Sequence, residues 1–139
     1  MKFTIYQASR QGGVYFLSDL REVNQVFYLE SALQWPKQIS FFPDGVPYFR
    51  VSPDGEKILL ATHVGGNEQY DIHLFTVRDK KTVPLVVDPD ERVESVFWEP
   101  GSRWFAYTSN KRNKVDFDLY QYDLASGKSS LLAELSGLN

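Results

Sequence analysis

The chain has 139 residues and a formal net charge of −3, with 42% hydrophobic and 24% charged residues. This composition excludes disorder as the default, and the acidic balance provides no electrostatic footprint for nucleic acid or an anionic membrane. The absence of cysteine excludes disulfides, thiolate metal sites and cysteine nucleophiles, while 15% aromatic residues favour strands.

The amino-terminal residues, MKFTIYQASRQGG, lack the apolar core and the small-residue cleavage site of a secretory signal. No stretch approaches the roughly 18 consecutive apolar residues of a membrane-spanning helix. We therefore expect a soluble, cytoplasmic protein.

The first third of the chain predicts four short strands with turn residues between them. These strands are Phe3–Ala8, Val14–Asp19, Gln25–Glu30 and Lys37–Phe42. A glycine-containing turn, residues 9–13, separates the first two strands. The segment 31–35 has room for a single helical turn at most, and a sustained 3.6-residue apolar period is missing throughout.

The middle third repeats this rhythm. Its predicted strands are Tyr48–Ser52, Lys57–Val64, Asp71–Val77 and Thr82–Val87. The turn Pro53-Asp54-Gly55 supplies a fixed φ, a side-chain hydrogen bond and tolerance of positive φ, as a tight reversal requires. A longer loop, residues 65–69, precedes the third strand.

The last third aligns with the middle third, without gaps, after a shift of 47 residues. Val51-Ser52-Pro53 then falls on Trp98-Glu99-Pro100, and Tyr70-Asp71-Ile72 falls on Phe117-Asp118-Leu119. The predicted strands are Glu94–Glu99, Trp104–Asn110, Asp118–Leu124 and Ser129–Leu135. Four strands in a repeat of 40 to 50 residues are typical of β-propeller blades. We predict one all-β domain over 1–139, a partial propeller with three four-stranded antiparallel blades at about 1–42, 43–89 and 90–139.

Two groups of segments carry a family resemblance. Residues 49–58, FRVSPDGEKI, resemble the blade signature of TolB-type and prolyl oligopeptidase family propellers. Residues 38–42 (QISFF), 65–72 (GGNEQYDI), 109–113 (SNKRN) and 116–120 (DFDLY) resemble the amino-terminal propeller of acylaminoacyl-peptidase-like members of that family. The resemblance implies a propeller that gates access to a separate α/β-hydrolase domain, where the chemistry takes place.

Catalytic motifs are missing from the chain itself. A serine nucleophile on a strained elbow requires the pattern G-x-S-x-G, yet no two glycines stand four positions apart. Dinucleotide, phosphate-loop and zinc-peptidase motifs are also absent. We therefore expect no catalytic residue, no cofactor and no peptidase activity from this chain alone.

Several polar residues are candidates for structural or binding roles. His63 and His73 lie on neighbouring predicted strands, where a facing pair could bind a metal, although surface or loop-supporting roles are favoured. The acids at positions 88, 90 and 91 lack the spacing of a calcium loop, so we expect no metal site. The basic loop at 111, 112 and 114 is interpreted as a solvated turn rather than a nucleic-acid contact.

A second set consists of turn and loop residues. Asp71 and Asp118 occupy equivalent positions at the start of a third strand, so a turn-forming role is favoured for both, as for Pro53, Asp54 and Gly55. In the enzymes that the chain resembles, acidic residues on propeller loops help to recognise a substrate amino terminus. Glu68, with Asn67, is therefore the candidate peptide contact, against the simpler role of a loop glutamate.

The predicted function is that of a non-catalytic propeller segment, a structural or protein- or peptide-binding module. The alternative is the propeller part of a split or truncated serine peptidase whose hydrolase domain is on another chain. A carbohydrate-active propeller is a third hypothesis, disfavoured because two histidines are too few for its metal ligands. For partners we expect a second copy, in a homodimer that completes a six-bladed ring or in a larger oligomer, and in addition a hydrolase domain or a peptide, but neither nucleic acid nor membrane.

Overall fold

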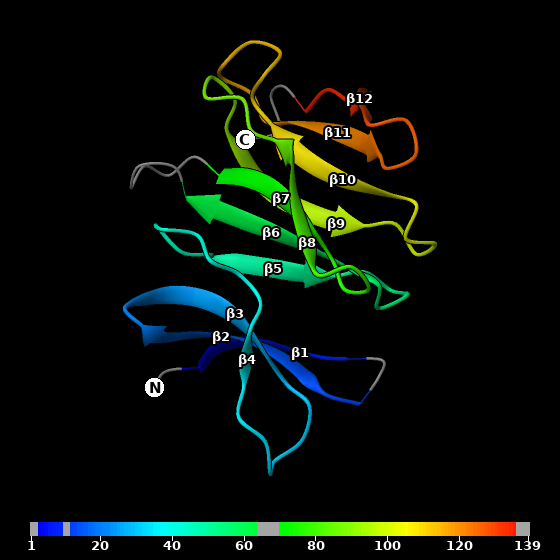
Figure 1. The fold of residues 1–139 in the computed structure, drawn as a ribbon. Helices are drawn as coiled ribbons and strands as arrows, with labels where there is room; N and C mark the ends of the chain where they lie inside the picture. Colours follow the sequence, from blue (N-terminus) through cyan, green and yellow to red (C-terminus); the bar gives the residue numbers. More distant parts are fainter. Residues whose placement is uncertain (1–2, 10–11, 64–69, 136–139) are drawn as a thin grey trace.

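The computed structural model describes residues 3–9, 12–63 and 70–135. Over these ranges the chain forms twelve strands and no helix, so none of the described segments is a helix that could span a membrane. The strands form three four-stranded antiparallel sheets, each with its strands in chain order, and Figure 1 shows these sheets stacked one on the next from blue through green to red. The all-β fold of three propeller-type blades is thereby confirmed.

Each blade comprises four strands whose bounds lie within a few residues of those predicted. Blade 1 contains β1 (Phe3–Ala8), β2 (Val14–Arg21), β3 (Val23–Leu29) and β4 (Lys37–Gln38). Blade 2 contains β5 (Tyr48–Val51), β6 (Lys57–His63), β7 (Tyr70–Thr76) and β8 (Lys81–Val86). Blade 3 contains β9 (Val93–Trp98), β10 (Trp104–Ser109), β11 (Asp118–Asp123) and β12 (Lys128–Ala133).

The prediction of a strand over Lys37–Phe42 was too long, because β4 ends at Gln38. The cause is Ser40, which is buried and whose Oγ accepts the N–H of Val26 at 2.8 Å. A side chain thus takes the place of the backbone carbonyl that would continue the ladder. Ser40 Oγ in turn donates to Gln25 Oε1 at 2.6 Å, which holds the departing segment against β3.

The turns repeat along with the strands. Gly55 in the β5–β6 turn has a φ of 75°, and Ser102, 47 positions later, has a φ of 60°. Lys80 in the β7–β8 turn has a φ of 54°, and Gly127, again 47 positions later, has a φ of 69°. All four φ angles are in the left-handed region that glycine adopts readily and other residues avoid.

Two apolar clusters join the blades, one on each face of blade 2. Because side chains alternate along a strand, neighbouring residues of β6 point to opposite faces. Leu60 faces blade 1, where Tyr15, Leu17 and Val26 meet Phe49 and Phe75. Leu59 faces blade 3, where the partners are Val93, Val96, Phe105, Tyr107, Tyr120 and Tyr122. Burial of each large side chain contributes roughly 1.5–3 kcal/mol, so blade 2 depends on both neighbours.

Hydrogen bonds link the blades along their first strands. Gln7 Oε1 of β1 accepts the N–H of Val51 at 2.9 Å. Trp98 Nε1 of β9 donates to the carbonyl of Arg50 at 2.8 Å. The N–H of Asp54 donates to Ser102 Oγ at 3.1 Å, which connects the equivalent turns of blades 2 and 3. These bonds add directional contacts to the apolar packing between the blades.

Candidate functional site: a pocket between blades 1 and 2

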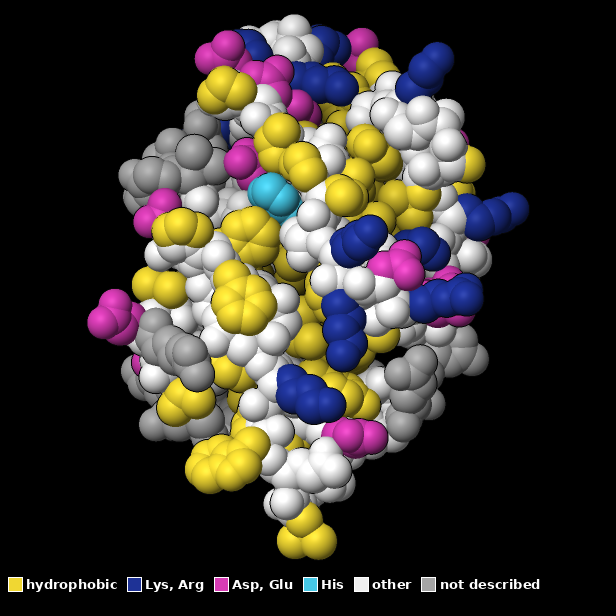
Figure 2. All heavy atoms as spheres, in the orientation of Figure 1, with side chains coloured by type: hydrophobic (Ala, Val, Ile, Leu, Met, Phe, Trp, Pro, Cys, Tyr) yellow, Lys and Arg dark blue, Asp and Glu magenta, His cyan; other side chains and the backbone are white. Residues whose placement is uncertain are grey.

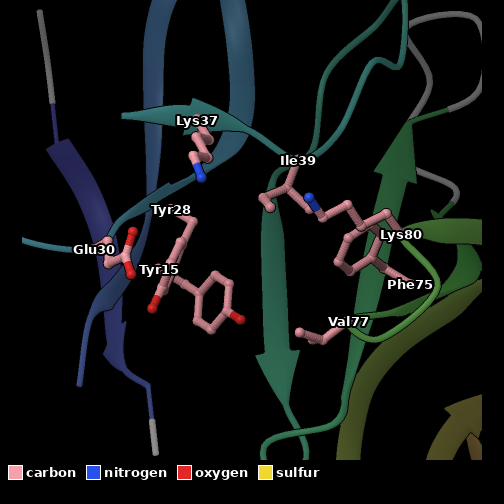
Figure 3. Close-up of a pocket in the computed structure, with 8 residues that line it drawn as sticks. All are labelled: Tyr15, Tyr28, Glu30, Lys37, Ile39, Phe75, Val77 and Lys80. Carbon is pink, nitrogen blue, oxygen red and sulfur yellow. The ribbon is translucent and has the colours of Figure 1, made fainter. Parts of the chain in front are cut away.

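A cavity of about 240 Å³ lies between the first two blades, toward their outer strands (Figure 3). Its apolar wall consists of Ile39, Phe75 and Val77, from the end of blade 1 and from the β7 region of blade 2. Phe75 is buried in the cluster between the blades. The wall is therefore part of the core packing, which keeps its shape fixed without a ligand.

Two tyrosines form the opposite wall. The rings of Tyr15 on β2 and Tyr28 on β3 lie side by side, with centroids 4.8 Å apart. Burial raises the pKa of Tyr15, and the neighbouring Tyr28 raises it further, so the Tyr15 hydroxyl stays protonated at neutral pH. Each of the two phenols has an O–H group that can donate a hydrogen bond to a group in the pocket.

Glycine allows the Tyr28 ring to lie where it does. A Cβ at Gly13 would stand 2.5 Å from the Tyr28 hydroxyl and 2.7 Å from the carbonyl oxygen of Leu29. The second of these atoms belongs to the backbone and cannot move freely, so any side chain at Gly13 would displace the ring. The pocket wall thus depends on a glycine outside the pocket.

Charged side chains surround the opening. Lys37 of β4 and Lys80 of the β7–β8 turn supply two positive charges, and Glu30 supplies one negative charge, which leaves a net charge of +1. Figure 3 shows the two ammonium groups directed inward on either side of Ile39, with the Glu30 carboxylate beside Tyr28. In Figure 2, dark-blue side chains gather over this part of the surface, with hydrophobic surface exposed between them. The pocket combines an apolar interior with a cationic entrance.

Solved structures that share the fold come from several kinds of protein. TolB from Acinetobacter baumannii has a TM-score of 0.69 and 16% identity, and the match covers 94% of this chain and 32% of TolB. A prolyl endopeptidase has a TM-score of 0.74 and 15% identity, over 97% of this chain and 23% of the enzyme. An oligogalacturonate lyase from Vibrio parahaemolyticus has a TM-score of 0.69 and 10% identity, over 94% and 39%.

The chain has the fold of a TolB-type β-propeller. This is also the fold of the propeller domains of prolyl oligopeptidase family enzymes, in agreement with the resemblance stated from the sequence. The chain spans less than half the length of each of these structures. No family model matches the chain, and the comparison with curated proteins finds no match. Because one fold accommodates a lyase and a peptidase, the function of this propeller must be argued from its own residues.

The two histidines of the propeller do not face each other. His73 pairs with Leu60 across β6 and β7, on the face toward blade 1, and its ring lies 4.7 Å from that of Phe42. His63 is three positions beyond Leu60 and therefore points to the opposite face, where its ring contacts Tyr70. The sheet itself separates them, and the described residues contain no cluster of three metal-ligating side chains.

The equivalent acids Asp71 and Asp118 have different surroundings. Asp118 is fully buried and accepts bonds from Arg112 Nε at 2.6 Å, Arg112 Nη2 at 3.2 Å and the N–H of Leu135 at 3.0 Å. The Arg112 guanidinium lowers the pKa of this carboxyl. Asp71 is partly exposed, and burial raises its pKa. Asp118 thus connects β11 both to the β10–β11 loop, through Arg112, and to the segment after β12, through Leu135. Its contacts therefore reach further than those of a residue that forms a single turn.

Asn67 and Glu68 lie outside the described residues. The other sequence candidates lie away from the pocket. In the β5–β6 turn that contains Pro53 and Gly55, the Asp54 carboxylate accepts bonds from Ser52 Oγ at 2.6 Å and from the N–H of Glu56 at 2.9 Å. The cations of the β10–β11 loop contact their own chain: Lys111 lies 4.4 Å from the centroid of the Tyr120 ring, and Lys114 Nζ donates to the carbonyl of Asp90 at 2.9 Å. The Asp88 carboxylate accepts the N–H of Asp90 at 2.9 Å within their own turn, and the Glu91 carboxylate accepts a bond from Ser109 Oγ on β10 at 2.6 Å.

Sequence reasoning did not find the pocket. Its walls come from residues 60 positions apart, such as Tyr15 and Phe75, and no motif links them. One signal was available in the 47-residue alignment, which places Lys80 opposite Gly127. A lysine at a turn position that another blade fills with glycine indicates that the side chain has a use.

Proposed function

We propose that this chain is a non-catalytic propeller module that binds a peptide segment. The proposal follows the resemblance to peptidases whose propeller domains contact the substrate and gate its access. The observation that carries the proposal is the pocket between blades 1 and 2. Its groups are suited to recognition: two phenols, two ammonium groups and one carboxylate around an apolar wall. None of them is arranged as a nucleophile with an adjacent base.

The size of the pocket supports a peptide as the occupant. A volume of about 240 Å³ accommodates a group the size of one amino-acid side chain with part of its backbone, and not a folded domain or a large cofactor. The exposed strand β8 lies at the outer edge of blade 2, close to the turn that carries Lys80. An extended chain could therefore continue from the pocket along this edge by strand addition.

Two measurements test the proposal. The first is labelling with a fluorophosphonate probe, which reacts with activated serines, and we expect no labelled protein. The second is a titration of isotope-labelled chain with a mixture of unstructured heptapeptides, followed by NMR. We expect saturable shifts at the amides of Tyr28, Ile39 and Val77, and none at Gln121 in blade 3. A labelled serine, or peptide shifts absent from the pocket, would contradict the proposal.

A further inference from the structure

We infer that the pocket between blades 1 and 2 takes the carboxy-terminal residue of a peptide, with its carboxylate at Lys37 and Lys80 and an apolar side chain against Ile39, Phe75 and Val77. This inference rests on the proposed peptide-binding function and specifies which part of the peptide is recognised. Three features of the site support it.

The first feature is charge. Lys37 and Lys80 form no ion pair with any described residue, whereas Lys57 lies 3.7 Å from Asp54. Two ammonium groups at the entrance of an apolar pocket repel each other unless an anion lies between them. With Glu30, the entrance has a net charge of +1, which a single carboxylate neutralises and a dianion such as phosphate exceeds.

The second feature is the backbone of Lys80. Its φ of 54° is in the left-handed region, which costs a non-glycine residue about 1–2 kcal/mol. The equivalent residue of blade 3 is Gly127, with a φ of 69°, and both turns close with the same bond, from Lys80 N–H to the carbonyl of Thr76 and from Gly127 N–H to that of Asp123, each at 2.8 Å. Glycine would therefore satisfy the turn of blade 2 at lower cost. Strain retained beside a pocket indicates that the side chain serves the pocket.

The third feature is the order in which the groups lie. Figure 3 shows the ammonium groups at the opening, the apolar residues Ile39 and Val77 along one wall, and the Glu30 carboxylate on the other side, near Tyr28. An internal peptide segment offers a carboxylate to the lysines only through an Asp or Glu side chain, and the same residue then has no apolar side chain for the wall. A carboxy-terminal residue offers a carboxylate to the lysines, a side chain to the apolar wall and its own N–H to Glu30.

The experiment compares three acetylated pentapeptides with the same first four residues, Gly-Ser-Gly-Ser. One ends in leucine with a free carboxylate, one ends in leucine amide, and one ends in serine with a free carboxylate. Titrations are followed by NMR at the amides of Tyr28, Ile39 and Val77. For a ligand of this size we expect a dissociation constant on the order of 1 mM for the leucine acid. We expect at least about fivefold weaker binding for the amide and for the serine acid, because each lacks one of the two recognised groups.

Variants of the chain complete the test. Lys37→Gln together with Lys80→Gln should weaken binding of the leucine acid by about fivefold and leave the amide unchanged. Lys80→Gly should weaken it by about threefold while the melting temperature stays the same or rises, a combination that a merely structural lysine would not produce. Lys128→Gln, at an exposed lysine of blade 3, is the matched control and should change neither the binding of the leucine acid nor the melting temperature.

The outcomes separate the two proposals. Equal binding of the acid and the amide, unaffected by the double substitution, would overturn recognition of the carboxylate and leave peptide binding intact. Binding of no peptide would overturn both. Binding that is stronger for the acid and lost in the double variant, but kept in Lys128→Gln, supports the inference.

Discussion

Lys80 and Gly127, 47 positions apart, have the same left-handed backbone, with φ angles of 54° and 69°, in the equivalent turns of blades 2 and 3. Of the two, only the glycine adopts this conformation without strain. The backbone of this turn therefore favours glycine, and a larger residue at Gly127 should reduce the stability of the fold. This is the first prediction.

Gly127→Val should destabilise the chain by about 1–3 kcal/mol, because a β-branched residue is strained at positive φ. The Cβ itself would not clash, since a Cβ at Gly127 would meet nothing closer than the Tyr122 hydroxyl at 3.7 Å. Gly55→Val, at a φ of 75° in the β5–β6 turn, should show a similar loss. Thermal unfolding measures both, and an unchanged midpoint in both variants would contradict the turn assignment.

Gly13→Ala should destabilise the chain by about 1–3 kcal/mol and weaken peptide binding at the pocket. The added Cβ would overlap the Tyr28 hydroxyl and the carbonyl of Leu29, so the ring must leave its place beside Tyr15. Thermal unfolding and the peptide titration report the two effects separately. Gly127→Ala, which adds the same methyl group away from the pocket, is the control and should leave binding as it is. Unaltered shifts at Tyr28 on substitution of Gly13 would argue against this dependence.

Arg112→Gln should lower the melting temperature more than Arg103→Gln. Arg112 is the partner of the fully buried Asp118, whose carboxylate would lose two charge-assisted bonds, whereas Arg103 is an exposed partner of Glu99. The pKa of Asp118 is lowered in the fold, so its contribution is present above the unfolded pKa of about 4 and is lost as the pH falls through the folded pKa. Equal melting temperatures for the two variants at pH 7 would refute the assignment.

Because His73 is partly buried, we predict that the free energy of unfolding decreases in mild acid. Burial against blade 1 lowers its pKa below the ordinary value of 6.5, so below this pH the unfolded chain takes up a proton that the folded chain resists. Stability from this residue is complete above pH 6.5 and declines as the pH falls toward the folded pKa. Urea unfolding between pH 5 and 7.5 should show the decline, and His73→Gln should flatten it. His63→Gln serves as the control for the loss of a histidine, and a slope that persists in His73→Gln would exclude this residue as its source.

The homodimer that completes a ring stays a prediction. The residues on the outer face of blade 3 affect how tightly we expect two chains to associate. In blade 2, the face that packs on the next blade carries Leu59, Ala61 and Leu74. The equivalent residues on the outer face of blade 3, 47 positions later, are Ala106, Thr108 and Gln121. These smaller or more polar side chains provide less apolar surface to bury. We expect the combination of Thr108→Val and Gln121→Leu to strengthen dimerisation in light scattering at micromolar concentration. Monomers for both the parent chain and this variant would exclude association through this face.

Much of the fold could be predicted from the sequence, because strand periodicity and the 47-residue repeat are local patterns. The strand β10 ends one residue before the predicted end, and β6 begins at the predicted residue, while its predicted last residue lies outside the described residues. The early end of β4 could not be predicted, because it depends on Ser40 reaching the N–H of Val26 in a neighbouring strand. The pocket could not be predicted either, since alternation says which side chains share a face but not how blade 1 is turned against blade 2.

The links between the first strands of the blades determine how the chain assembles. The bonds from Val51 to Gln7, from Trp98 to Arg50 and from Asp54 to Ser102 each span 44 to 48 residues, so every seam closes a loop of nearly the same length. The entropic cost of closing the loop is therefore nearly the same for both seams. We expect folding to begin at either seam and to propagate from there to the neighbouring blade. Blade 2 belongs to both seams, so we expect the amides of its inner strands β6 and β7 to exchange with solvent last, whichever end of the chain frays first.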